Sequence, residues 1–147
     1  MISESNVTNK SSINILGYST YLSPHPDGTA HAGSAIVDRK GLNYNLLAPY
    51  DKDYLQAASV MVNTRTGFIT LSAVYCPPKH KISEANFTDF FKTLGNRFIA
   101  GGDWNAKHIY WGSRLTTSRG RSLKVCLDSN HLLTLFNATL RLSYLRL

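Results

Sequence analysis

Hydrophobic and polar positions in the first half of the chain follow the short period of β-strands. Two apolar stretches, Leu55 to Val62 and Phe68 to Tyr75, are separated by Asn63-Thr-Arg-Thr-Gly67, which predicts an antiparallel hairpin. In the second stretch apolar side chains fall on both faces, so we expect a sheet that is covered on both sides. A shorter run, Ser34 to Asp38, follows the turn-rich segment Pro24 to Gly28 and predicts another strand.

After Pro77-Pro78 the period changes to that of a helix. Aromatic and aliphatic residues recur at i, i+3, i+4 and i+7, with Ser83 placed to cap the first turn and Gly95 to end the last one; these residues are Phe87, Phe90, Phe91 and Leu94. Three further elements are predicted: a strand at Arg97 to Ala100, a helix at Ser118 to Asp128 with Leu123, Cys126 and Leu127 inward, and a strand at His131 to Phe136. This order predicts an α/β fold in which helices cover sheets.

The composition fits one domain and favours an anionic partner. The 147 residues include 43% hydrophobic and 17% charged positions, which is typical of a soluble globular protein, and no apolar run approaches the roughly 20 residues that span a bilayer. The beginning of the chain does not resemble a secretory signal, so an intracellular location is expected. A formal net charge of +7 favours a polyanion, although the cations are scattered and charge alone leaves nucleic acid at about even odds. Two widely spaced cysteines do not predict a zinc site.

The segment Arg97 to His108 carries the clearest candidate chemistry. A short strand is expected to lead into Gly101 and Gly102, which permit a sharp turn and leave room for a substrate. Asp103 and Asn105 follow, and alternate residues of an extended segment project to the same side, so both are expected to face one pocket. There a carboxylate could take a proton from a water nucleophile, and an amide could hydrogen-bond a phosphoryl oxygen.

Each of these residues also has a simpler interpretation. Gly, Asp and Asn are common turn residues, so the motif could be only a turn. Tyr75, before Cys76-Pro-Pro78, could donate its hydroxyl to a phosphate, but alone it is better explained as a core tyrosine that ends a strand. Downstream, Trp111 to Arg114 and Thr117 to Arg121 add an aromatic face and several cations to the same region.

Together these segments resemble the endonuclease/exonuclease/phosphatase superfamily, specifically the endonuclease domain of jockey-like non-LTR retrotransposons. They occur in the family's order and extend to about Asn137. The matching segments are Ile2-Ser-Glu-Ser5, Pro26-Asp-Gly-Thr-Ala-His-Ala-Gly-Ser-Ala35, Gln56-Ala-Ala-Ser59, Ser72-Ala-Val-Tyr-Cys-Pro-Pro78, Phe98-Ile-Ala-Gly-Gly-Asp-Trp-Asn-Ala-Lys-His108, Trp111-Gly and Ser118-Arg-Gly-Arg121.

The resemblance implies a four-layered α/β sandwich, in which two packed and mainly antiparallel sheets are flanked by helices, here incomplete. It implies hydrolysis of a DNA phosphodiester with Mg²⁺ or Mn²⁺, the nick that primes target-site reverse transcription. Glu4 matches the carboxylate that holds the metal, and Tyr75 the tyrosine that contacts the phosphate. Asp103 matches the residue that activates the attacking water, and Asn105 the amide that orients it. Position alone would instead make Glu4 an exposed residue near a frayed end.

The expected partner is DNA, with no membrane and no small organic cofactor, and a nuclear location follows from the family. Lys107, Arg119 and Arg121 are candidates for contacts with backbone phosphates, with solvated surface charge an equal alternative. His31 and His108 lie inside matching segments but have no assigned role.

The resemblance divides the chain into a partial domain at residues 1–137 and a divergent tail at 138–147. The family's Asn upstream of the Glu, its final Ser-Asp-His element and a further Asp are not present in this sequence, and His131 does not replace that histidine. Groups that act on one transition state are not independently dispensable, so we expect weak or absent nicking. The alternatives are a non-catalytic DNA-binding remnant, an abasic-site nuclease or phosphatase of the same superfamily, and a fold fragment without its own function.

Overall fold

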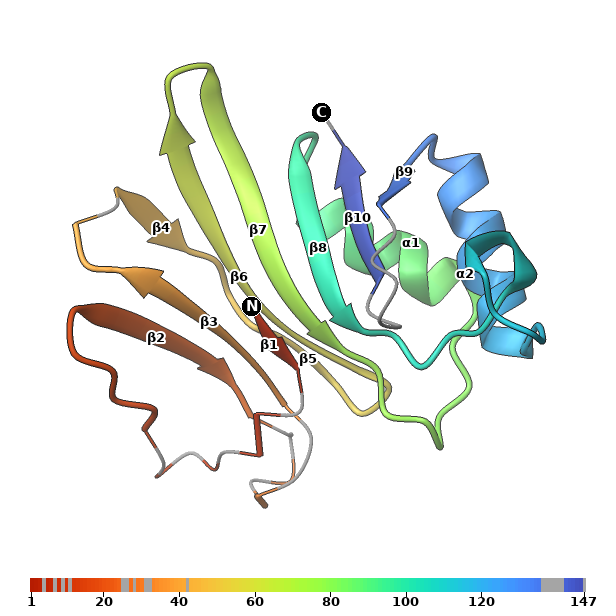
Figure 1. The fold of residues 1–147 in the computed structure, drawn as a ribbon, viewed down its shortest axis with the longest axis horizontal. Helices are drawn as coiled ribbons and strands as arrows, with labels where there is room; N and C mark the ends of the chain where they lie inside the picture. The colour runs from red at the N-terminus through yellow and green to blue at the C-terminus, as the bar shows by residue number, and fades with distance from the viewer. Residues whose placement is uncertain are drawn as a thin grey trace.

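Two β-sheets form the centre of the computed structural model (Figure 1). It describes residues 1–3, 5–6, 8, 10, 12–24, 27, 29–30, 33–41, 43–135 and 142–146, with residues 3, 133–135 and 142–146 described by their backbone alone. The smaller sheet is antiparallel and has the order β1-β3-β2; its strands are β1 (Ile2–Ser3), β2 (Tyr18–Ser23) and β3 (Ser34–Arg39). The predicted strand at Ser34 to Asp38 is therefore confirmed.

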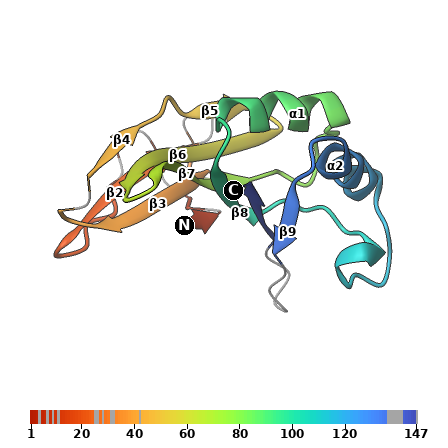
Figure 2. The ribbon, with the colours of Figure 1, turned by 90° about the horizontal axis from the view of Figure 1, so that it is seen from above.

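The larger sheet has the order β4-β6-β7-β8-β10-β9, and β5 pairs with β6 beside β4. Its strands are β4 (Tyr44–Leu46), β5 (Tyr50–Lys52), β6 (Leu55–Thr64), β7 (Gly67–Tyr75), β8 (Phe98–Asp103), β9 (Leu133–Leu135) and β10 (Leu142–Arg146). Figure 2 shows helices α1 (Glu84–Thr93) and α2 (Ser118–Ser129) on one face of this sheet and the smaller sheet on the other. The fold is therefore a mixed α/β sandwich, as the sequence predicts.

The β6–β7 hairpin is confirmed and forms the boundary between two hydrophobic cores. Its strands pair antiparallel from Gln56 opposite Tyr75 to Thr64 opposite Gly67. One face packs against the helices through Leu55, Ala57 and Val74, and the other packs against the smaller sheet. That second core consists of Ile36, Ala58, Val60 and Ala73. Burial on both faces holds for the half of the hairpin near Tyr75, whereas Phe68 near the tip is exposed.

Helix α1 begins and ends where the sequence predicts. The Ser83 hydroxyl accepts a hydrogen bond from the Asn86 backbone N–H at 3.2 Å, and the Asn86 side chain accepts one from the Ser83 backbone N–H at 3.0 Å, which completes a capping box. Gly95 follows the helix with φ 79°. The buried face of α1 packs its phenylalanines against the fully buried Trp104. Helix α2 is confirmed with Leu123, Cys126 and Leu127 inward.

Several strands lie outside the sequence predictions. The strands β1, β2, β4 and β5 are short or half-buried and have weak periodicity. The predicted strand at His131 to Phe136 is confirmed only as β9, and Phe136 lies outside the described residues. The described part of the predicted tail at 138–147 forms β10, which pairs antiparallel with both β8 and β9.

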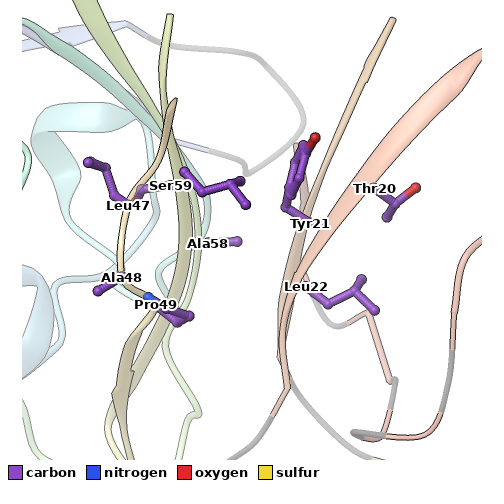
Figure 3. A pocket seen from close by; sticks show the side chains of 9 residues that line it. Thr20, Tyr21, Leu22, Leu47, Ala48, Pro49, Ala58 and Ser59 are labelled. Carbon is purple, nitrogen blue, oxygen red and sulfur yellow. The ribbon is translucent and has the colours of Figure 1, made fainter. Parts of the chain in front are cut away.

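A pocket of about 570 Å³ lies between the two sheets (Figure 3). Its walls come from β2, from the segment that joins β4 to β5, and from β6; they include Tyr21, Leu22, Leu47, Pro49 and Ala58. Of the described residues predicted to carry chemistry, none lines it. Within the described part of the chain, no helix has the length and apolar character that crossing a membrane requires.

Candidate active site

The strands β7 and β8 bring two predicted site residues to one edge of the larger sheet. They run parallel and are connected through α1, so their carboxyl ends lie together. Tyr75 and Asp103 are register partners at these ends, and the Cys76 backbone N–H donates to the Asp103 carbonyl oxygen at 2.9 Å. Backbone pairing therefore fixes how closely the two residues approach.

Gly102 allows this close pairing. A Cβ atom at Gly102 would lie 1.9 Å from the Val74 carbonyl oxygen, and its φ of 152° is one that L-residues rarely adopt. The prediction that Gly101 and Gly102 form a sharp turn after the strand is wrong, because both lie inside β8. The absence of a side chain at Gly102 allows β8 to lie close to β7, and the chain changes direction only after Asp103.

Asp103 and Asn105 are close together for a different reason from the one predicted. They are not alternate residues of an extended segment, because Asn105 has a left-handed backbone with φ 46°. Instead, the Asp103 Oδ1 atom accepts a hydrogen bond from the Asn105 backbone N–H at 2.9 Å. The Asn105 Nδ2 atom donates to the Cys76 carbonyl oxygen at 3.1 Å, which fixes the orientation of the amide. Asp103 is half-buried and Asn105 exposed, whereas Tyr75 is largely buried.

Arg119, at the start of α2, connects the loops that follow β7 and β8. Its side chain is 6% exposed. The Nη1 atom donates to the carbonyl oxygens of Cys76, Trp104 and Asn105 at 3.2, 3.3 and 3.5 Å. The Nη2 atom donates to the carbonyl oxygens of Pro77 at 2.7 Å, Pro78 at 3.2 Å, and His80. Burial lowers the pKa of Arg119, and the nearby Cys76, Asp103 and Tyr75 side chains oppose that shift.

These contacts contradict the expectation that Arg119 binds a DNA phosphate, because its guanidinium already donates hydrogen bonds to backbone carbonyl oxygens of the protein. The sequence contains a signal for this burial in the spacing along α2. Arg119 precedes the inward residues Leu123, Cys126 and Leu127 by four, seven and eight positions, so all four lie on one face of α2. Burial also raises the pKa of the Cys76 thiol beside it.

The other predicted residues are placed as follows. Lys107 and Arg121 are exposed, and their contacts with phosphate stay a prediction. His108 begins the short helical turn η1 (Ile109–Trp111), where its Nδ1 atom accepts from the Tyr110 backbone N–H at 3.1 Å. Glu4 and His31 lie outside the described residues. The strand β1, which precedes Glu4 in the sequence, contacts both β7 and β8.

A groove of about 590 Å³ lies next to Asn105, between the beginnings of α1 and α2. The described residues that line it contribute cationic and hydroxyl side chains and no carboxylate; they include Lys79, His80, Lys81, Ser83, Asn105, Thr117 and Ser118. This composition makes the groove suitable for an anion beside the candidate site.

Comparisons with known proteins agree with this arrangement. Residues 69–144, which include most of β7 and all of β8, match the family model described as "Endonuclease-reverse transcriptase". The RNA-directed DNA polymerase from mobile element jockey of Drosophila funebris is 36% identical over 84% of this chain, and the Drosophila melanogaster protein of that name is 40% identical over 74%. The chain belongs to the endonuclease family of non-LTR retrotransposons. It spans about 14% and 12% of the length of those two relatives.

Solved structures show the same fold in this family and beyond it. The endonuclease domain of TRAS1, a telomere-specific non-LTR retrotransposon, superimposes with a TM-score of 0.70 at 24% identity, covering 88% of this chain and 65% of that one. The human Nocturnin catalytic domain gives a TM-score of 0.56 at 15% identity, covering 89% of this chain and 61% of that one. These likenesses establish the endonuclease/exonuclease/phosphatase fold.

Proposed function

We propose that this retrotransposon endonuclease domain hydrolyses a phosphodiester of duplex DNA with a divalent metal ion, the nick that primes reverse transcription at a target site. The observation that carries the proposal is the convergence of Tyr75, Asp103 and Asn105 at the carboxyl ends of two parallel strands. A nuclear location follows from this proposal, because the target would be chromosomal DNA.

The residues have separate roles in the proposed reaction. The Asp103 carboxylate, half-buried at the end of β8, accepts the proton of the attacking water. Asn105, whose amide is held by the Cys76 carbonyl oxygen, orients that water and hydrogen-bonds the phosphoryl oxygen as negative charge develops. Tyr75 donates its hydroxyl to the phosphate. The neighbouring groove, with Lys79 and Lys81, attracts the DNA backbone.

The oxygen donors at this site fit Mg²⁺ or Mn²⁺. Mg²⁺ keeps several waters and needs only one or two protein carboxylates, whereas zinc sites use three or four nitrogen and sulfur ligands. Among the described residues no group of three or more His, Cys, Asp or Glu is placed to hold a metal. Glu4 is the proposed ligand. When bound, the ion would polarise the phosphate and stabilise the charge that builds on it.

Nicking of supercoiled plasmid in Mg²⁺ tests this proposal. We expect slow conversion to the relaxed circle, because the sequence lacks the Ser-Asp-His element expected of the family. Asp103→Ala is expected to lower the rate at least about a hundredfold, the usual scale for a lost general base. Asp89→Ala, an exposed carboxylate on α1, is the matched control and should leave the rate unchanged. Equal rates for the parent chain and Asp103→Ala would refute the catalytic proposal.

Substrate comparison separates the related alternatives. Intact duplex, duplex with an abasic site and a phosphomonoester would be incubated at equal concentration. A clear preference for the abasic duplex or the phosphomonoester would assign the chain to another activity of the superfamily. Salt-dependent DNA binding without any cleavage would instead support the non-catalytic remnant.

A further inference from the structure

We infer that the loop from Lys107 to Thr117 is a rigid apolar wedge that enters the minor groove of the DNA duplex beside the nicked phosphate. This inference rests on the proposed function for its DNA substrate. It assigns a role to the His108 and Trp111-Gly112 elements, which the proposed reaction does not use.

The loop is closed and internally braced. At its base the Thr117 backbone N–H donates to the Lys107 carbonyl oxygen at 2.9 Å, and the Lys107 backbone N–H donates to the Thr117 hydroxyl at 3.2 Å. Inside the loop, the His108 carbonyl oxygen accepts from the backbone N–H groups of Trp111 and Ser113, both at 3.2 Å. The loop therefore has a defined shape without a bound partner.

Two contacts hold the loop against the candidate site. The Trp111 indole N–H donates to the Ala106 carbonyl oxygen at 3.1 Å, one residue after Asn105. Gly120 of α2 packs so closely on the loop base that a Cβ atom there would lie 1.9 Å from the Lys107 carbonyl oxygen. A ligand that contacts the loop is therefore held at a fixed distance from Asn105.

This braced loop presents large apolar side chains to solvent. Ile109 is 66% exposed, Tyr110 62% and Leu115 51%. The Ile109 backbone N–H donates to the Thr116 hydroxyl at 3.3 Å, which brings the segment with Leu115 next to Ile109. In Figure 2 the helical turn of η1, in cyan, projects away from the two sheets. Apolar side chains gathered on a rigid projection are typical of a binding surface.

The charges around the loop favour DNA over a protein partner. The sequence from 104 to 127 contains no Asp or Glu, and five Lys and Arg residues lie within it, of which Arg119 is buried. Lys107, Arg114 and Arg121 are exposed, whereas the Lys124 ammonium pairs with the Asp128 carboxylate and lies 4.2 Å from the centre of the Tyr110 ring. Proteins that kink DNA from the minor groove combine such cations, which contact phosphates, with apolar side chains that open a base step.

Duplex binding measured over a range of salt concentrations tests the wedge. The Ile109→Ser/Tyr110→Ser variant should bind about tenfold more weakly, the scale for lost apolar and stacking contacts to bases. Its slope of log affinity against log salt should equal that of the parent chain, because no phosphate contact is removed, whereas Arg114→Gln should reduce the slope by about 1. A 2-aminopurine in the duplex should brighten with the parent chain and stay quenched with the serine variant.

The matched control is Leu46→Ser/Phe68→Ser, which removes one exposed aliphatic and one exposed aromatic side chain far from the loop in sequence. Unchanged affinity of the loop variant, or an equal loss in the control, would overturn the wedge alone. A concentration-dependent dimer that the loop variant abolishes would also overturn it, by assigning the surface to self-association. If the parent chain binds no duplex at all, the proposed function fails together with the wedge.

Discussion

Arg119→Met should destabilise the fold strongly, although the side chain keeps nearly the same length. The arginine donates to six carbonyl oxygens in the two loops that follow β7 and β8. Three of these bonds, to Cys76, Trp104 and Pro77, are buried, so water cannot replace them in the variant.

The magnitude follows from these acceptors. The Cys76 oxygen keeps the Asn105 amide as a donor, so the full cost falls on the two other buried oxygens, those of Trp104 and Pro77, which lose the arginine. At about 1–3 kcal/mol for each lost donor, these two cost about 2–6 kcal/mol. Removing the buried guanidinium also removes its desolvation penalty, which is the same effect that lowers the pKa of Arg119. We therefore expect Arg119→Met to lower the free energy of unfolding by about 2–4 kcal/mol, a large share of the 5–15 kcal/mol typical of a domain. Arg119→Lys should cost less than Arg119→Met, because its ammonium can still donate to some of these oxygens. It should still destabilise the fold, because one ammonium cannot serve both loops as the planar guanidinium does.

Urea unfolding followed by tryptophan fluorescence measures this change, since Trp104 is fully buried. Arg121→Met is the matched control, because Arg121 is exposed on the same helix and its loss should change stability by less than about 0.5 kcal/mol. A loss of less than about 1 kcal/mol in Arg119→Met would refute the reasoning, since it would mean that solvent satisfies the loop carbonyls without the arginine.

Two further predictions concern packing and buried thiols. Exchange of glycine for alanine in a helix normally stabilises a protein by about 1 kcal/mol. Gly120→Ala should instead destabilise the fold by about 1–3 kcal/mol and loosen the 107–117 loop, because the new Cβ atom would collide with the Lys107 carbonyl group. An unfolding midpoint at or above that of the parent chain would contradict this prediction. Burial raises the pKa of both Cys76 and Cys126, so the folded state favours the neutral thiols. Their contribution to stability is complete below the thiol pKa of the unfolded chain, and it is lost as the pH rises toward the thiol pKa values of the folded state. Native protein at pH 8 should therefore react with iodoacetamide far more slowly than unfolded protein, and equal alkylation rates would disprove the burial.

The elements with strong periodicity could be predicted from the sequence, and the weak ones could not. The β6–β7 hairpin, α1 and α2 each bury one or two continuous apolar faces, so their patterns are regular. By contrast, β4 and β5 have three residues each and depend on pairing with β6. No local pattern encodes such pairing, because an edge strand gains its stability from a neighbour that is distant in sequence.

The proximity of Tyr75, Asp103 and Asn105 could be predicted from the sequence, but their geometry could not. The sequence order shows that Tyr75 and Asp103 end successive strands, and parallel pairing through α1 brings them together. The left-handed conformation of Asn105 depends on contacts with Asp103 and with the carbonyl oxygen of Cys76, a loop residue distant in sequence. Composition likewise counts Arg119 as a surface charge, and only the helical face that it shares with Leu123 indicates that it is buried.

The βαβ unit from Gly67 to Asn105 determines how substitutions elsewhere in the protein would affect the candidate site. Tyr75 and Asp103 owe their spacing to main-chain pairing inside one continuous stretch, whereas the smaller sheet supplies a separate core through Ile36. Substitutions that weaken β2 or β3 should therefore lower the fraction of folded molecules while leaving Tyr75 paired with Asp103 in the molecules that stay folded. Sequence drift in that sheet would reduce the amount of folded protein well before it altered the spacing of these two residues.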